Sequence, residues 1–139
     1  MEMYLIDTVV LSELRKRQRH SGLVKWLRDK AAETLFLSIV TIGEIERGIL
    51  RQRSQDPAFA EALAAWLDRT IGIYADRILA IDLPIARCWG RLSARIGHGS
   101  ADLLIAATAL ERGLIVVTRN VRHFAPTGVS VEDPFAGAA

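Results

Sequence analysis

Met3-Tyr4-Leu5-Ile6-Asp7-Thr8 is the stretch from which the fold can be predicted, because it reads as a short buried strand that ends in a carboxylate. Its apolar residues show no polar alternation, which is typical of a strand covered on both faces. From Thr8 to Arg17 the pattern changes to helical spacing, so Asp7 lies where a strand is followed by a helix. Ligands of open parallel sheets bind beyond the carboxyl ends of the strands. We therefore expect Asp7 at the functional edge of a sheet.

Strands and helices are predicted to alternate along the rest of the chain. Four further apolar stretches predict strands, the last of them at an edge: 35–39, 78–81, 114–118 and 129–131. Helical spacing predicts a first helix that begins over 10–14 and breaks around 20–22, and further helices over 23–32, 41–50, 57–71, 84–96 and 101–112. Ser100 is expected to cap the last of these helices, and Gly113 to end it. The alternation indicates one α/β domain over residues 1–139, with a mostly parallel sheet of four to five strands covered by helices on both faces.

The composition is that of a compact globular protein, since 50% of the 139 residues are hydrophobic and 24% are charged. Cys88 is the only cysteine, so no internal disulfide can form, and its apolar neighbours at helical spacing predict a buried core residue. The sequence predicts no membrane span and no signal peptide, so we expect a cytoplasmic protein. The formal net charge of +2 allows a polyanionic partner but does not require one.

Three carboxylates are predicted to converge on the carboxyl edge of the sheet. Asp7 ends the first strand, Glu44 lies in the first helical turn after the second strand, and Asp102 lies in the first turn of a later helix. Asn120 and His123 follow the fourth strand and bring further polar groups to the same edge. Four separate segments therefore contribute polar side chains to one place.

Each acid also has a structural explanation that needs no chemistry. Asp7 would cap the first helix, Thr41-x-x-Glu44 fits a capping box, and Asp102 would face the positive end of its own helix. Convergence of the three acids favours a chemical role over capping, because carboxylates drawn together without a cation repel and raise one another's pKa. A hard divalent cation such as magnesium or manganese prefers carboxylate oxygens, and at such a site it would activate water for phosphodiester hydrolysis.

Four blocks of sequence together resemble the PIN-domain ribonucleases, in particular the VapC-type toxins of bacterial toxin–antitoxin systems and their FitB-like relatives. The blocks are YLIDTVVLSEL at 4–14, SIVTIGEIERGI at 38–49, SADLLIAATA at 100–109 and VTRNVRHF at 117–124. They occur in the family's order and spacing. The resemblance therefore covers essentially the whole chain.

This resemblance implies a PIN-like three-layer sandwich and a toxin that acts as a magnesium- or manganese-dependent endoribonuclease. The family's acidic metal ligands correspond to Asp7, Glu44 and Asp102 of this chain, one of which could bind through water, and Asn120 would complete the catalytic site. The resemblance also implies an RNA substrate and a VapB-type antitoxin that occupies the active-site cleft. A toxin homodimer within a toxin–antitoxin hetero-oligomer is expected for the same reason.

Two departures from the family pattern keep a second interpretation open. Val9 stands where the family commonly has a polar residue, often Asn, and the fourth acid often found near the last block is replaced by Asn120 or His123. Asn120 would orient a water through its side-chain oxygen, whereas His123 would contact phosphate or pack beside Phe124. The alternative to a ribonuclease is a catalytically weak PIN-like module that binds RNA or a protein.

Two groups of basic residues have roles that the sequence leaves open. One is a dense segment near the end of the first helix, and the other is a row at helical spacing: Arg15, Lys16, Arg17, Arg19 and His20, then Arg87, Arg91 and Arg95. Either group would hold an RNA backbone by charge without reading its sequence. For the second group, a solvated helix face is an equally good explanation.

Overall fold

The computed structural model of the chain describes residues 1–16 and 18–136, so Arg17 of the basic segment lies outside the described residues. Within these residues, five strands form a parallel sheet in the order β3-β2-β1-β4-β5. The strands are β1 (Tyr4–Ile6), β2 (Leu35–Ser38), β3 (Ile78–Leu79), β4 (Ile115–Val117) and β5 (Val131–Glu132). The strand predicted before Asp7 therefore lies at the centre of the sheet.

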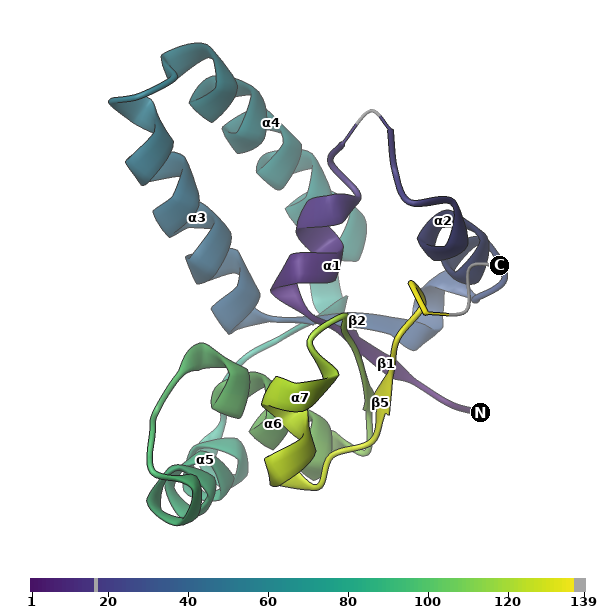
Figure 1. The fold of residues 1–139 in the computed structure, drawn as a ribbon, viewed down its shortest axis with the longest axis vertical. Helices are drawn as coiled ribbons and strands as arrows, with labels where there is room; N and C mark the ends of the chain where they lie inside the picture. The colour runs from purple at the N-terminus through teal and green to yellow at the C-terminus, as the bar shows by residue number, and fades with distance from the viewer. Residues whose placement is uncertain (17, 137–139) are drawn as a thin grey trace.

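Helices cover both faces of this sheet, as Figure 1 shows. One face carries α1 (Thr8–Glu13), α2 (Ser21–Arg28), α3 (Ile39–Arg53) and α4 (Pro57–Tyr74). The other face carries α5 (Leu83–Ile96), α6 (Ala101–Arg112) and α7 (Val121–Phe124). The predicted three-layer α/β sandwich is confirmed.

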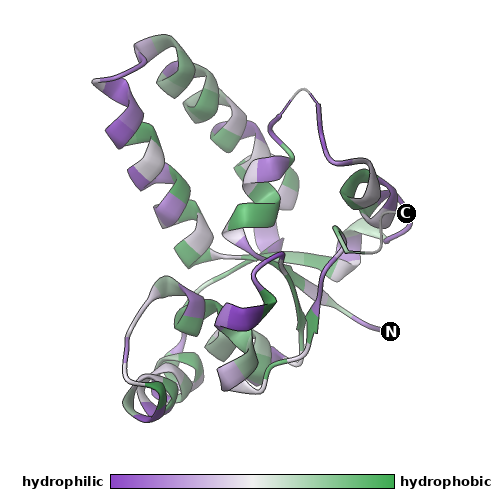
Figure 2. Cartoon of the chain, in the orientation of Figure 1, coloured by the Kyte–Doolittle hydropathy of each residue, from purple (hydrophilic) through white to green (hydrophobic). Residues whose placement is uncertain are grey.

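The core has two parts because alternate residues of a strand point to opposite faces of the sheet. Tyr4 and Ile6 of β1 pack against the α1 and α3 side, whereas Leu5 packs against the α5 and α6 side. Leu5 and Ile6 are fully buried, as expected for a strand covered on both faces. Figure 2 shows the strands in hydrophobic colours and the outer side of α3 in hydrophilic ones.

Several predicted boundaries agree closely with the structure. Helix α6 has the predicted bounds, and it ends at Gly113, whose φ of 68° is a left-handed conformation that glycine adopts without strain. Pro57 and Pro84 lie in the first turns of α4 and α5, where the missing N–H costs nothing. Cys88 is a buried, free thiol, as predicted.

Other boundaries differ from the prediction. Helix α1 ends at Glu13, because the chain tightens into a turn in which the N–H groups of Leu14 and Arg15 donate to the carbonyls of Leu11 and Ser12. The strand predicted over 129–131 lies two residues later, at Val131–Glu132, where it pairs with β4 at the edge. Among the described residues, no helix combines the length and the apolar character that crossing a membrane requires.

Candidate active site

Asp7 lies directly after the central strand β1, and its side chain is almost completely buried. Its Oδ1 accepts a hydrogen bond of 2.8 Å from the backbone N–H of Thr8, so the predicted helix cap is confirmed. Its Oδ2 accepts a second hydrogen bond of 2.8 Å from the hydroxyl of Thr118, which follows β4. Both carboxylate oxygens are therefore held, and the carboxylate has one orientation.

The pKa of the Asp7 carboxyl is raised from 3.8 to about 6. Burial is the largest cause, because it penalises the charged form, and the hydrogen bonds from Thr118 and Thr8 oppose it. The carboxylates of Asp102 and Glu44 also raise the pKa of Asp7 through like-charge repulsion. Thus the acids at positions 7, 44 and 102 lie within electrostatic reach of one another, although they are far apart in sequence.

Glu44 reaches this place from helix α3, but not by the capping box that its sequence suggested. Helix α3 begins at Ile39, because the hydroxyl of the buried Ser38 accepts a hydrogen bond of 3.1 Å from the N–H of Val40. The Thr41-x-x-Glu44 capping box is therefore wrong, and Glu44 lies in the second turn rather than the first.

The carboxylate of Glu44 is instead held by helix α1. Its Oε1 accepts a hydrogen bond of 2.6 Å from the hydroxyl of Thr8, whose oxygen lies 3.0 Å from the hydroxyl oxygen of Thr41. The other carboxylate oxygen of Glu44, Oε2, lies 3.9 Å from the Arg47 guanidinium. Thr8 thus joins the two acids, because its N–H binds Asp7 and its hydroxyl binds Glu44.

Asp102 lies in the first turn of α6, as predicted. Its Oδ2 is 3.3 Å from Nδ1 of His123 on α7. His123 was expected to contact phosphate or to pack beside Phe124, and in the structure its contact is with Asp102. Ser100 occupies the cap position of α6, but its side chain makes no capping hydrogen bond.

Asn120 and Thr118 connect the end of β4 to Asp7. The backbone N–H of Asn120 donates a hydrogen bond of 2.9 Å to the Thr118 hydroxyl, which in turn donates to Asp7. Thr118 was not among the predicted site residues. Its place directly after a predicted strand, at the edge where Asp7 was expected, was the signal that could have identified it.

The acids do not form a ready-made metal cage. Within residues 1–16 and 18–136, no three His, Cys, Asp or Glu side chains are grouped closely enough to hold one ion. Glu44 is held by the hydroxyl of Thr8, and Asp102 faces His123. The donor chemistry nevertheless fits a hard divalent cation, because all three groups offer carboxylate oxygens and Asp7 is buried beside two other acids.

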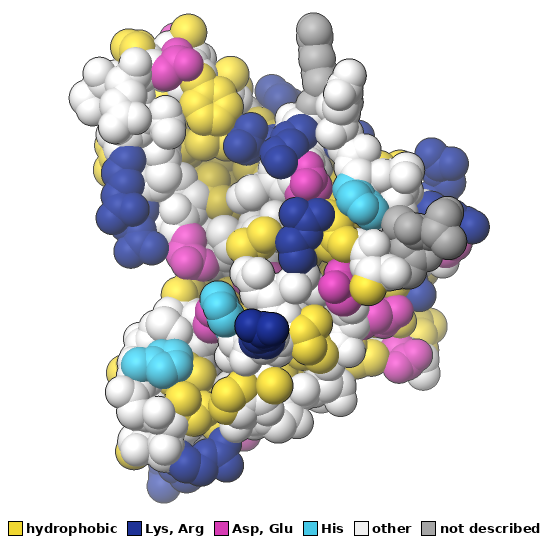
Figure 3. All heavy atoms as spheres, viewed as in Figure 1, with side chains coloured by type: hydrophobic (Ala, Val, Ile, Leu, Met, Phe, Trp, Pro, Cys, Tyr) yellow, Lys and Arg dark blue, Asp and Glu magenta, His cyan; other side chains and the backbone are white. Residues whose placement is uncertain are grey.

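Two hollows flank helix α1 beside these acids, and Thr8 and Ser12 line both. The first, of about 210 Å³, lies on the side of α3 and α4 and includes Glu44 and Gln52. The second, of about 290 Å³, is lined by Thr8, Val9, Ser12, Glu13, Arg15, Lys16 and Arg119. On the face drawn in Figure 3, Lys and Arg side chains gather over α1. A basic surface therefore adjoins the acidic one.

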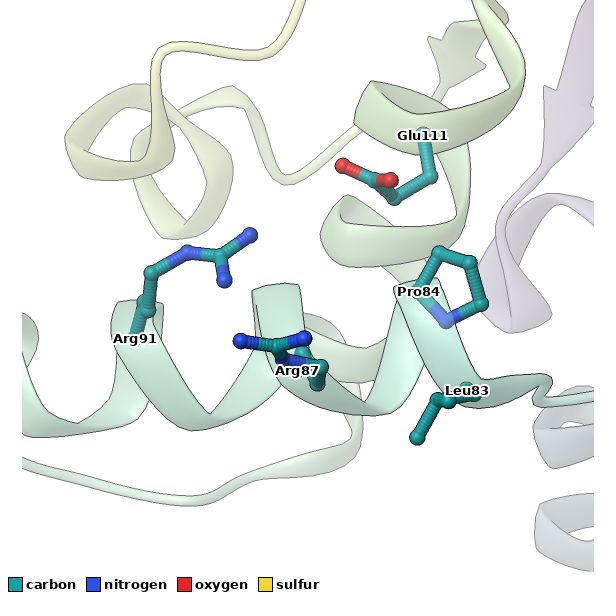
Figure 4. A pocket seen from close by; sticks show the side chains of 5 residues that line it. All are labelled: Leu83, Pro84, Arg87, Arg91 and Glu111. Atoms are coloured by element: carbon teal, nitrogen blue, oxygen red, sulfur yellow. The ribbon is translucent and has the colours of Figure 1, made fainter.

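The predicted arginine row on α5 lies at a separate pocket. That pocket, of about 340 Å³, is lined by Leu83, Pro84, Arg87, Arg91 and Glu111, with Glu111 contributed by the facing helix α6 (Figure 4). None of the acids at positions 7, 44 and 102 lines it.

The chain is similar to known proteins in both sequence and structure. A family model described as PIN domain matches residues 4–128. VapC ribonuclease Y4jK of Sinorhizobium fredii is 31% identical over 98% of this chain and 100% of its own length, and toxin FitB of Neisseria gonorrhoeae is 32% identical over 96% and 99%. The crystal structure of FitAcB from Neisseria gonorrhoeae superposes with a TM-score of 0.83 at 30% identity, covering 96% of this chain and 99% of that one. The similarity extends over nearly the whole length of each pair.

Proposed function

The chain belongs to the PIN domain family and is a toxin of the VapC and FitB type, and from this membership we propose that Asp7, Glu44 and Asp102 bind the divalent cation with which it hydrolyses RNA. The observation that carries the proposal is the environment of Asp7, which is 2% exposed and has a pKa raised to about 6 by burial and by the other two acids. Burying a carboxylate beside like charges destabilises a fold, and such groups cluster at functional sites. Residues 1–139 would then form a single PIN domain.

The residues around the acids have distinct roles in this proposal. The N–H of Thr8 and the hydroxyl of Thr118 orient Asp7, and the hydroxyl of Thr8 orients Glu44. Magnesium, or manganese in its place, supplies Lewis acidity and positive charge for phosphodiester hydrolysis when it is bound. Asp7 and Asp102 would be direct ligands, Glu44 would act directly or through water, and Asn120 would complete the polar rim of the site.

The partner of a toxin of this type is an antitoxin. Solved structures similar to this chain include toxin–antitoxin complexes, FitAcB among them. We extend this to a VapB-type antitoxin that covers the acidic site, and to a homodimer of this chain within the toxin–antitoxin assembly. Size measurement of the chain with and without its antitoxin would test the assembly.

The test of the catalytic proposal is RNA cleavage by purified protein and two variants, Asp7→Asn and Asp102→Asn. We expect cleavage with added magnesium or manganese, loss of cleavage with a chelator, and loss of at least about 100-fold in either variant. Glu111→Gln is the matched control, because Glu111 is an exposed carboxylate on the same helix as Asp102 and lines the separate pocket. It should cleave like the unmodified chain.

Equal cleavage by the Asp7→Asn variant would contradict the proposal. RNA binding that needs no metal, without any cleavage, would favour the alternative of a catalytically weak module, which is motivated by Val9 and by the missing fourth acid. Offering RNA and DNA of the same sequence in one assay separates a ribonuclease from a general phosphodiesterase.

A further inference from the structure

The hollow between α1 and Arg119 is distinct from the acidic site and differs from it in charge. We propose that it is a substrate subsite that binds a backbone phosphate of single-stranded RNA, next to the phosphate that is cleaved. This inference rests on the proposed function, because it assigns the neighbouring surface to the same substrate.

The hollow adjoins the acids through helix α1. Thr8, Ser12 and Arg15 are spaced by four and three residues, so they form one stripe along α1 and the turn that follows it. The same three residues line both hollows, which makes the stripe a ridge between the Glu44 side and the Arg119 side. Because Thr8 binds both Asp7 and Glu44, a strand of RNA that crosses this ridge would pass directly from the acids into the basic hollow.

Two guanidinium groups of the hollow are positioned by aromatic rings rather than by carboxylates. Arg15, which borders both hollows, lies at 5.0 Å over the ring of Phe59, a residue of the hollow on the α3 and α4 side. Arg119 lies over the ring of Phe135 at 3.7 Å. Among the described residues, neither forms an ion pair with an acid. Stacking fixes the plane of a guanidinium while its N–H edge remains available, and this edge matches the oxygens of a phosphate.

The hollow carries a net positive charge. Glu13 is paired with Lys16 at 3.2 Å, so these two groups largely neutralise each other and the two arginines remain. The surface on α5 is less suited to phosphate, because Glu111 lies beside Arg87 and Arg91 and because Arg95 donates to the carbonyl of Pro126. The α1 hollow is therefore the better phosphate site of the two.

The hollow is small and has an apolar wall beside its charged groups. Its volume of about 290 Å³ is just below the range of roughly 300–1,000 Å³ that is typical of ligand sites, so it suits one small group such as a phosphate. Val9 is 42% exposed and lines it, which gives an apolar surface for a sugar or a base beside the charged groups. The valine that replaces the family's usual polar residue thus has a place in substrate binding.

The test measures RNA binding in an Asp7→Asn background without metal, so that the RNA is not cut. The probe is a short fluorescein-labelled single-stranded oligoribonucleotide, read by fluorescence anisotropy across a range of salt concentrations. Arg15→Gln and Arg119→Gln should each weaken binding roughly tenfold. Each should also reduce the slope of log K against log salt by about 0.7, the value for one lost phosphate contact with a single strand.

Arg28→Gln is the matched control, since Arg28 is an exposed arginine in the last turn of α2 and lines neither hollow. It should change neither the affinity nor the slope. Arg15→Lys keeps the charge and should recover part of the affinity. In the cleaving protein, Arg15→Gln and Arg119→Gln should raise KM more than they lower kcat, as expected for groups that bind substrate away from the reacting atoms.

Unchanged binding in both glutamine variants would overturn the subsite, and so would an equal loss in Arg28→Gln, which would indicate a general effect of charge. Loss of antitoxin binding with unchanged RNA binding would also overturn it and assign the hollow to the protein partner. Failure of the proposed function has a different signature, because a protein that cuts no RNA with any metal could still show the arginine-dependent binding.

Discussion

Asp7 meets two requirements that oppose each other. It caps α1 and lies at the centre of the site, but it is a buried carboxylate beside two other acids. The pKa of Asp7 is 3.8 in the unfolded chain, its ordinary value, and about 6 in the folded protein. The folded state therefore binds the proton more strongly than the unfolded state does. Between these two pH values the folded protein holds more protons, so stability falls as the pH rises and the carboxylate ionises.

Asp7→Asn should therefore stabilise the protein while it removes cleavage. The pKa shift corresponds to about 3 kcal/mol at neutral pH, as an upper value for the gain. The gain should shrink as the pH falls from 6 and be absent below about 4, where Asp7 is protonated in both states. Urea unfolding of the parent and of Asp7→Asn at several pH values, in the presence of a chelator, measures this gain in stability. Asp68→Asn, an exposed change on α4, is the control, and an Asp7→Asn variant less stable than the parent at pH 7 would count against the burial argument.

Thr118 is expected to act as a positioning residue for Asp7. Thr118→Val keeps the shape but removes the donor to Asp7 and the acceptor for the N–H of Asn120, so it should destabilise the protein by roughly 1–3 kcal/mol. It should also lower kcat with little change in KM, because Asp7 loses its fixed orientation. Thr118→Ser restores the hydroxyl and should recover most of the cleavage. A Thr118→Val variant with normal kcat would show that this hydroxyl is only structural.

At the scale of single elements, helix α3 is the informative case. Its start is set by Ser38, a buried residue at the end of β2, and not by Thr41. This moves Glu44 into the second turn, where the hydroxyl of Thr8 on α1 binds it. The position of one cap therefore decides which part of α3 faces the other acids.

Ser38→Ala should destabilise the protein by about 1 kcal/mol, because the N–H of Val40 loses its acceptor. Urea unfolding measures the change. Ser54→Ala at the far end of α3 is the control and should have little effect, because Ser54 is exposed. If the Ser38→Ala variant is as stable as the parent, packing alone fixes the start of α3.

At the scale of the whole molecule, the parallel sheet brings the acids together. Strands β1, β2 and β4 are neighbours in the sheet, so the segments that follow them end at one edge. Helix α6 enters the same edge from the other face, and its Asp102 raises the pKa of Asp7. No single element contains more than one of the three carboxylates.

A cation bound by all three segments should stabilise the whole fold. Magnesium or manganese at about 100 times its Kd should add about 2.7 kcal/mol to the free energy of unfolding, because only the folded chain brings the acids together. Thermal unfolding with and without the ion measures this, and a chelator should reverse the gain. The Asp7→Asn and Asp102→Asn variants should show much smaller gains, whereas an equal gain in both would place the ion elsewhere.

Local patterns in the chain were enough to predict the order of the strands and of every helix from α1 to α6, the sandwich they form, and the positions of Asp7 and Asp102 within their elements. These features depend on hydrophobic period, capping and glycine or proline chemistry, which involve residues close in sequence. The short helix α7 after β4 was not predicted. The helix around Glu44 was placed wrongly at its start, since both Ser38 and Thr41 are good caps and only the packing of β2 chooses between them.

The side-chain contacts that build the site were decided only by the packing of segments that are distant in sequence. Three contacts at the site join residues that lie up to 111 positions apart: Thr8 with Glu44, Thr118 with Asp7, and His123 with Asp102. No local sequence pattern encodes such pairs. The stacked arginines depend on Phe59 and Phe135 in the same way. The physical reason is that side-chain partners across a sheet are set by strand order and register, which emerge only when the whole core is buried together.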